Sequence, residues 1–145
     1  MIKKNKRKIV AVAGGFDPIH IGHIRHLREA KKLGDKLVVM LASDEDMIVK
    51  KGKPFMLFSE RKEILEAINY VDEVVGRIDK DGTVAETLKR IKPNVFAKGG
   101  DRIPENMPQN ELDVCKAERI KIVYDVGGEK IQSSSELTGL YLKKR

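Results

Sequence analysis

The sequence predicts an α/β fold, a doubly wound parallel sheet of five strands with helices on both faces. Short β-branched and aliphatic runs alternate with stretches in which apolar residues recur every three or four positions. Helices of this length between strands form right-handed crossovers and therefore a parallel sheet. In addition, glycine-containing, charged loops follow the first and fourth strands, at the edge where ligands of Rossmann-like sheets bind.

Each element is predicted from a local pattern. The predicted strands cover residues 8–13, 36–42, 73–76, 94–97 and 120–124. The predicted helices cover residues 22–33, about 59–71, 83–92 and 111–118, and a last helix follows Ser133. Gly34 ends the first helix, and Ser59 is the expected N-cap of the second. Thr83 and Glu86 form an expected capping box for the third, which ends before Pro93.

Length, charge and cysteine usage limit the class of protein. The chain is predicted as a single domain, residues 1–145, with a basic tail over residues 1–7. Part of the net charge of +7 lies in the terminal runs, and no nucleic-acid-binding motif organises the rest. An anionic small-molecule substrate explains this charge at least as well as nucleic acid does. Cys115 is the only cysteine, which excludes an internal disulfide and favours the cytoplasm. We find no membrane-spanning stretch and no signal peptide.

The strand–loop–helix corner at residues 14–23 is the most informative segment. Backbone N–H groups at the start of a helix favour an anion, and His20 and His23 add movable positive charge. Phosphate binding is therefore the leading interpretation. Two alternatives remain open: a tight turn with capping histidines, and a zinc site with His26 as a third ligand. The corner contains neither the dinucleotide-binding glycine pattern nor the phosphate-binding loop that ends in Lys-Ser/Thr.

Four further features are candidates for the same site. The loop 98–102 follows the fourth strand and contains Gly99, Gly100 and Asp101. Lys50, Lys51 and Lys53 lie in a glycine-broken stretch, which is either a solvated basic loop or a mobile lid over phosphates. Ser133, Ser134 and Ser135 precede the last helix, where three hydroxyls suit a phosphate, although a capping box with Glu136 explains one of them. By periodicity, Arg61 is an exposed helix charge.

The pattern G-x-F-D-x-x-H-x-G-H resembles the signature of the HIGH-motif nucleotidyltransferases. Residues 33–39 and 59–74 resemble the cytidylyltransferase branch, which includes glycerol-phosphate cytidylyltransferases. Residues 98–101 are similar to a loop of heptose-phosphate adenylyltransferases, and residues 133–135 to the hydroxyl run before the last helix of the family. Together these matches follow the family's order over nearly the whole chain.

This resemblance implies a reaction and a set of residues. CMP or AMP would pass from CTP or ATP to a phosphorylated sugar, polyol or phosphonate, with Mg²⁺ present and pyrophosphate released. His20 and His23 would contact the triphosphate, as would Arg61. Lys50 aligns with an essential lysine, and the family's second lysine falls on Gly52, for which Lys53 could compensate. The implied nucleotide-binding residues are Gly14, Gly15, Phe16, Asp17, Gly22, Lys53, Gly99, Gly100, Asp101, Ser133, Ser134 and Ser135.

Some implications concern the metal, the acceptor and the assembly. Asp17 and Asp101 could orient a hydrated Mg²⁺ or the ribose, but no residue is assigned as a direct metal ligand. The glycerol-phosphate branch has an arginine where this chain has residues 127–130, so Lys130 would have to supply that charge. A homodimer is expected. The competing hypothesis is a non-catalytic nucleotide- or nucleic-acid-binding module on the same fold, but the histidines, lysines and serines are all present and favour an enzyme.

Overall fold

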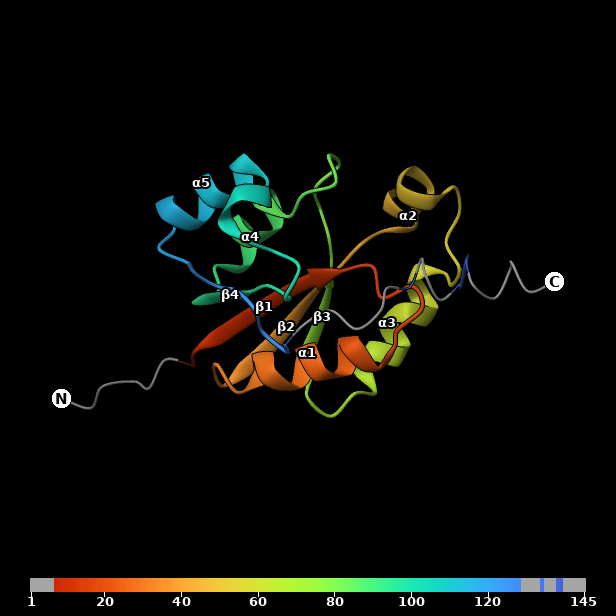
Figure 1. The fold of residues 1–145 in the computed structure, drawn as a ribbon, viewed down its shortest axis with the longest axis horizontal. Helices are drawn as coiled ribbons and strands as arrows, with labels where there is room; N and C mark the ends of the chain where they lie inside the picture. Colours follow the sequence, from red (N-terminus) through yellow and green to blue (C-terminus); the bar gives the residue numbers. More distant parts are fainter. Residues whose placement is uncertain (1–6, 129–133, 135–137, 140–145) are drawn as a thin grey trace.

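The computed structural model describes residues 7–128, 134, 138 and 139. Five strands form one parallel sheet in the order β3-β2-β1-β4-β5 (Figure 1). The strands are β1 Ile9–Gly14, β2 Lys36–Leu41, β3 Glu73–Gly76, β4 Val95–Ala97 and β5 Lys121–Val123. Every predicted strand is confirmed, and no predicted end differs from the observed end by more than 1 residue. The predicted fold class is confirmed.

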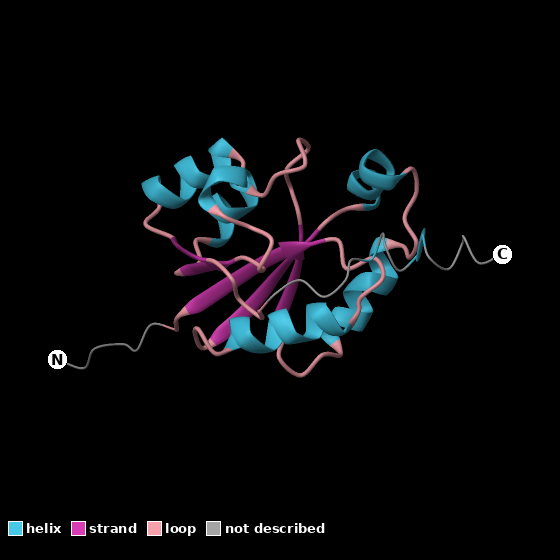
Figure 2. Ribbon diagram, viewed as in Figure 1, coloured by secondary structure: helices cyan, strands magenta, loops and turns pink. Residues whose placement is uncertain are grey.

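Helices cover both faces of the sheet (Figure 2). They are α1 Ile21–Lys31, α2 Asp44–Lys51, α3 Phe58–Glu66, α4 Ala85–Ile91 and α5 Gln109–Ala117, with a 3₁₀ turn at Pro104–Asn106. Helices α1 and α3 pack on one face, where Leu27 and Leu65 join the core. Helices α4 and α5 pack on the other, where Leu88 and Val114 join the second core. Strand β1 is central because it pairs with both β2 and β4.

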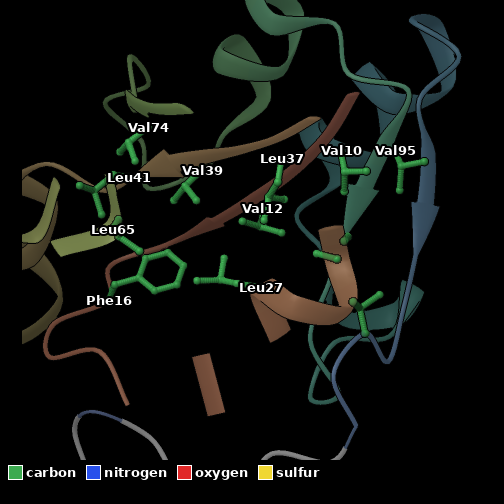
Figure 3. Packing of buried hydrophobic residues seen from close by; sticks show 13 residues of the cluster. Val10, Val12, Phe16, Leu27, Leu37, Val39, Leu41, Leu65, Val74 and Val95 are labelled. Atoms are coloured by element: carbon green, nitrogen blue, oxygen red, sulfur yellow. The ribbon is translucent and has the colours of Figure 1, made fainter. Parts of the chain in front are cut away.

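Alternation along β1 feeds both cores. Val10 and Val12 belong to the core under α1 and α3, whereas Ala11 belongs to the core under α4 and α5. In the first core, Phe16 approaches Leu27 of α1 (Figure 3). Burial of each large apolar side chain stabilises the fold by about 1.5–3 kcal/mol. The corner that follows β1 is therefore anchored through Phe16.

Two predicted helix starts are wrong, because the caps come from other parts of the chain. Ser59 lies inside α3, whose first N–H, that of Phe58, donates to Asp44 Oδ1 at 2.7 Å. Helix α4 begins after Val84, and the Asp79 carboxylate accepts the N–H groups of Glu86 and Thr87. These contacts satisfy orphan donors at the helix ends as local caps would.

Helix α2 lies where we predicted no helix. Ser43 and Asp46 form a reciprocal capping box at its start, with donor–acceptor distances of 3.0 and 2.9 Å. Gly52 ends it with φ +90°, a conformation that favours glycine. Lys50 and Lys51 therefore lie in the last turn of a helix rather than in a loop.

The ends of the chain are only partly described. Residues 1–6 of the predicted basic tail lie outside the described residues, and of the segment predicted as the last helix only Ser134, Thr138 and Gly139 are described. Within the described part of the chain, no helix has the length and apolar character needed to span a membrane.

Candidate active site

A cavity of about 300 Å³ lies at the carboxyl ends of β1 and β4. This is the point where the strand order reverses direction, and ligands of doubly wound sheets bind there. The residues that line it come from the corner after β1 and the first turns of α1, from the end of α2, and from the loops after β4 and β5, together with Ser134. The sequence-predicted residues that it brings together are Gly14, Gly15, Phe16, Asp17, His20, Gly22, His23, Lys50, Lys51, Gly99, Gly100, Asp101 and Ser134.

His20 and His23 cap the start of α1 for one another. The N–H of Gly22 donates to His20 Nδ1, and the N–H of His20 donates to His23 Nδ1, both at 3.1 Å. Because each Nδ1 accepts, the ring proton of each neutral imidazole resides on Nε2. Both rings thus carry an Nε2–H donor at the positive end of the α1 dipole, an arrangement suited to an anion. The capping interpretation and the phosphate interpretation therefore describe the same geometry.

The two rings are held by their packing. They stack with centroids 3.9 Å apart, and the Phe16 ring lies 4.8 Å from that of His23. A Cβ at Gly22 would come within 2.9 Å of the His20 ring, so glycine leaves the room that this ring needs. Phe16 is buried and has a φ of +49°, so its contribution is to support His23 from the core side.

Asp17 is buried and fastens the segment after α2 to the corner. Its carboxylate accepts the N–H groups of Phe55 at 2.7 Å and of Met56 at 2.6 Å. Lys51 Nζ donates to the Asp17 carbonyl oxygen at 2.6 Å. Lys50 and Lys51 both line the cavity, but Lys51 is tied into the corner by this hydrogen bond, whereas the Lys50 side chain is exposed. Lys53 is also exposed but does not line the cavity.

Arg61 is buried rather than exposed, and it does not line the cavity. Its guanidinium donates to the carbonyl oxygens of Met56, Gly15 and Ala42 and to Asp44 Oδ1, at 2.8–3.0 Å. Charged groups are rarely buried unless they are paired in this way. Arg61 joins the corner, the end of β2 and the start of α2, so the exposed-charge interpretation is wrong.

The loops after β4 and β5 close the opposite wall. The N–H of Val126 donates to the Lys98 carbonyl oxygen at 2.9 Å, and a Cβ at Gly100 would overlap the Gly128 carbonyl oxygen. Lys98 itself lines the cavity, with Nζ 4.5 Å from the centre of the Phe96 ring. Burial lowers the pKa of its ammonium group. We did not predict Lys98 as a site residue, although its position directly after a buried strand indicates the sheet edge where ligands bind.

His26 joins this wall to α1. Its Nδ1 donates to the Val126 carbonyl oxygen at 2.7 Å, and its ring lines the cavity. Burial lowers its pKa, and the nearby Lys98 acts in the same direction. Within the described residues, no group of three histidine, cysteine or acidic side chains is placed to hold a metal ion. The zinc alternative therefore gains no support from the described residues.

Ser134 is the described member of the serine run. Its Oγ donates to the Pro18 carbonyl oxygen at 2.6 Å, next to the histidine corner. Ser133, Ser135 and Lys130 lie outside the described residues.

Comparison with known proteins gives a consistent result. Residues 11–137 match the cytidylyltransferase-like family. The chain is 39% identical to the FAD synthase of Thermococcus kodakarensis over 142 residues, which cover 92% of each chain. It is 46% identical to the FAD synthase of Pyrococcus abyssi over 100 residues, 68% of this chain and 66% of that one. It is 37% identical to the bifunctional protein HldE of Pelobacter propionicus over 129 residues, 88% of this chain but 26% of that one.

The chain thus spans slightly less than two thirds of the Pyrococcus protein and about a quarter of HldE. Among solved structures, it resembles a lipopolysaccharide core biosynthesis protein from Thermoplasma volcanium GSS1. The TM-score is 0.70 at 30% sequence identity, and the match covers 82% of this chain and 96% of that one.

Proposed function

The chain belongs to the cytidylyltransferase-like family, and from that premise we propose that it transfers AMP from ATP to a phosphate-bearing acceptor. The observation that carries the proposal is the pair of Nε2–H donors of His20 and His23 in the cavity at the strand switch point. ATP is preferred to CTP because the name FAD synthase recurs among the relatives, and FAD contains an AMP unit.

The reaction joins two phosphates. An oxygen of the acceptor phosphate forms a bond to the α-phosphorus of ATP, and the bond from that phosphorus to the bridging oxygen breaks. Pyrophosphate leaves with the electron pair. Negative charge grows on the phosphate oxygens, and donors that are already oriented stabilise it at little reorganisation cost. His20 and His23 would contact these oxygens, and Lys50 would reach them from the end of α2.

The other wall would hold the acceptor phosphate and the ribose. Lys98 brings a cation to the cavity, and a bound phosphate would favour its charged form. Asp101 and the backbone of Gly99 and Gly100 line the same wall. Arg61 and Asp17 act as positioning residues in this proposal, because their hydrogen bonds hold the corner and the segment after α2.

Magnesium fits this site only as part of the nucleotide complex. Both carboxylate oxygens of Asp17 accept backbone N–H groups, so Asp17 is unsuited to ligation, whereas Asp101 is exposed at the cavity. Held with the nucleotide, the ion would neutralise phosphate charge while it keeps most of its waters. Asp101 would orient those waters.

We also propose a homodimer that works in the cytoplasm. Val49, Phe55 and Leu57 expose apolar side chains on α2 and the segment that follows it, which supports association. Light scattering coupled to gel filtration would measure the mass in solution, and a monomeric mass would contradict the dimer.

The test of function is pyrophosphate release from ATP or CTP, measured with FMN, sugar phosphates and polyol phosphates as acceptors. FMN is the first acceptor to try, and mass spectrometry would identify FAD as the product. Release from ATP that depends on one acceptor supports the proposal. Tight nucleotide binding without release from any nucleotide–acceptor pair would instead support the non-catalytic module.

A further inference from the structure

His26 has one ring nitrogen in a hydrogen bond and one without a hydrogen-bond partner among the described residues. Nδ1 donates to the Val126 carbonyl oxygen, which can only accept, so this nitrogen carries a proton. Nε2 has no hydrogen-bond partner among the described residues. It is also not one of the buried, unpaired side-chain polar atoms of these residues, so it is in contact with solvent. Since the residue lines the cavity, Nε2 is accessible there.

The surroundings of His26 favour the neutral form of its ring. Burial lowers the pKa, and the positive charge of Lys98 lowers it further, while Asp101 and the hydrogen bond to Val126 act in the opposite direction. A neutral ring with its proton on Nδ1 presents a lone pair at Nε2. Nε2 is therefore a hydrogen-bond acceptor, in contrast to the Nε2–H donors of His20 and His23.

The position of His26 suits a contact with the nucleobase rather than with the phosphates. It lies three residues beyond His23 on α1, one turn farther from the positive helix end and on the same face. It contacts the loop after β5, which passes close to α1 (Figure 1). That loop packs against the loop after β4, and both loops line the cavity together with His26.

We propose that His26 selects nucleobases that carry an amino group at purine C6 or pyrimidine C4, by accepting one amino N–H at Nε2. The inference rests on the proposed function and narrows the nucleotides that this site takes to those with this amino group. Adenine and cytosine offer an amino donor, whereas hypoxanthine, guanine and uracil place a carbonyl oxygen at the corresponding position. Two facing acceptors repel, and a site built for one partner rejects an analogue that lacks it.

Three nucleotides that share the triphosphate and ribose test this directly. ATP has the amino group, purine riboside triphosphate has hydrogen in its place, and ITP has a carbonyl oxygen. Calorimetric titration of the whole chain with each, with Mg²⁺ present, needs no acceptor. We expect ATP to bind about tenfold more tightly than ITP, with purine riboside triphosphate between them.

Two kinds of variant separate base recognition from loop positioning. In His26→Phe we expect the ATP-to-ITP ratio of binding affinities to fall to near one. In His26→Gln, whose amide oxygen can accept a hydrogen bond, we expect part of this ratio to remain. In Gly127→Ala the histidine stays, but the new methyl group meets the His26 Cα at 2.7 Å and φ is +98°. This variant shifts the loop, so we expect all three nucleotides to bind more weakly by one common factor.

An unchanged ATP-to-ITP ratio in both His26 variants would overturn the inference and leave the proposed function intact. If the ATP-to-ITP affinity ratio of Gly127→Ala falls as far as that of His26→Phe, the selection belongs to the loop. This result would also overturn the inference. If none of the three nucleotides binds the wild type, the proposed function fails and the inference fails with it.

Discussion

Substitution of His23 by Asn and by Gln separates the two contributions of this side chain. Nδ1 of His23 accepts the His20 N–H at 3.1 Å, and Nε2 carries the donor for the phosphate. An Asn amide reaches the position of Nδ1 and keeps the cap but not the distal donor. A Gln amide reaches the position of Nε2 and keeps a donor but not the cap.

The magnitudes follow from these contacts. Loss of one donor to a developing oxyanion costs about 10²–10³ in turnover, or about 3–4 kcal/mol. Loss of a helix cap costs about 1 kcal/mol of folding stability. We therefore expect His23→Asn to fold like the wild type and lose at least about a hundredfold in kcat/KM. We expect His23→Gln to lose about 1 kcal/mol of stability but to retain more activity than His23→Asn.

Pyrophosphate release with ATP and the identified acceptor gives kcat/KM, and urea unfolding gives stability. The reasoning is refuted if the two variants have equal kcat/KM, or if His23→Asn retains wild-type turnover. A large loss of stability in His23→Asn would show that the ring packing with His20 and Phe16, rather than the cap, holds the corner.

Three further predictions concern stability, charge and pH. Arg61→Met should lower the free energy of unfolding in urea by about 3–5 kcal/mol, because it leaves buried carbonyl oxygens unpaired; a loss under about 1 kcal/mol would contradict this. Lys50→Ala should lower kcat/KM about tenfold at unchanged stability, because Lys50 lines the cavity. Lys53 is exposed and does not line the cavity, so Lys53→Ala should keep wild-type kcat/KM. Equal losses in the two variants would indicate an unspecific effect of positive charge. The pKa of His26 is lowered in the fold, so the unfolded chain binds the proton more readily. The stabilising contribution of the neutral His26 is therefore present above pH 6.5 and is lost as pH falls through the lower folded pKa. In urea unfolding, the free energy of unfolding of His26→Phe should fall less on acidification than that of the wild type. Parallel plots of this free energy against pH would contradict the prediction.

Much of the candidate site could be read from the sequence because its segments are contiguous. Residues 14–23 carry their own loop, helix start and chemistry, and the strand pattern places residues 98–101 at the same sheet edge. The pattern Ser43 to Asp46 also indicates the capping box of α2, although we predicted no helix there. Local patterns of this kind depend on interactions between residues a few positions apart.

What failed depended on partners distant in the sequence. Hydrophobic periodicity predicted that Arg61 is an exposed charge. It is buried, because the carbonyl oxygens of Gly15 and Ala42 accept hydrogen bonds from its guanidinium group. Ser59 looked like an N-cap, but Asp44 supplies that hydrogen bond from another helix.

The sequence by itself determined the five parallel strands, their order of appearance and the strand switch point as the place of the site, because hydrophobic periodicity and crossover handedness are local and general. Only the tertiary structure decided which lysines line the cavity and which nitrogen of each histidine carries its proton. It also decided which charged side chains hold the loops together through buried hydrogen bonds. The reason is physical: a buried charge or a ring tautomer is set by the polar atoms that the fold brings within hydrogen-bond distance, and those atoms come from segments far apart along the chain.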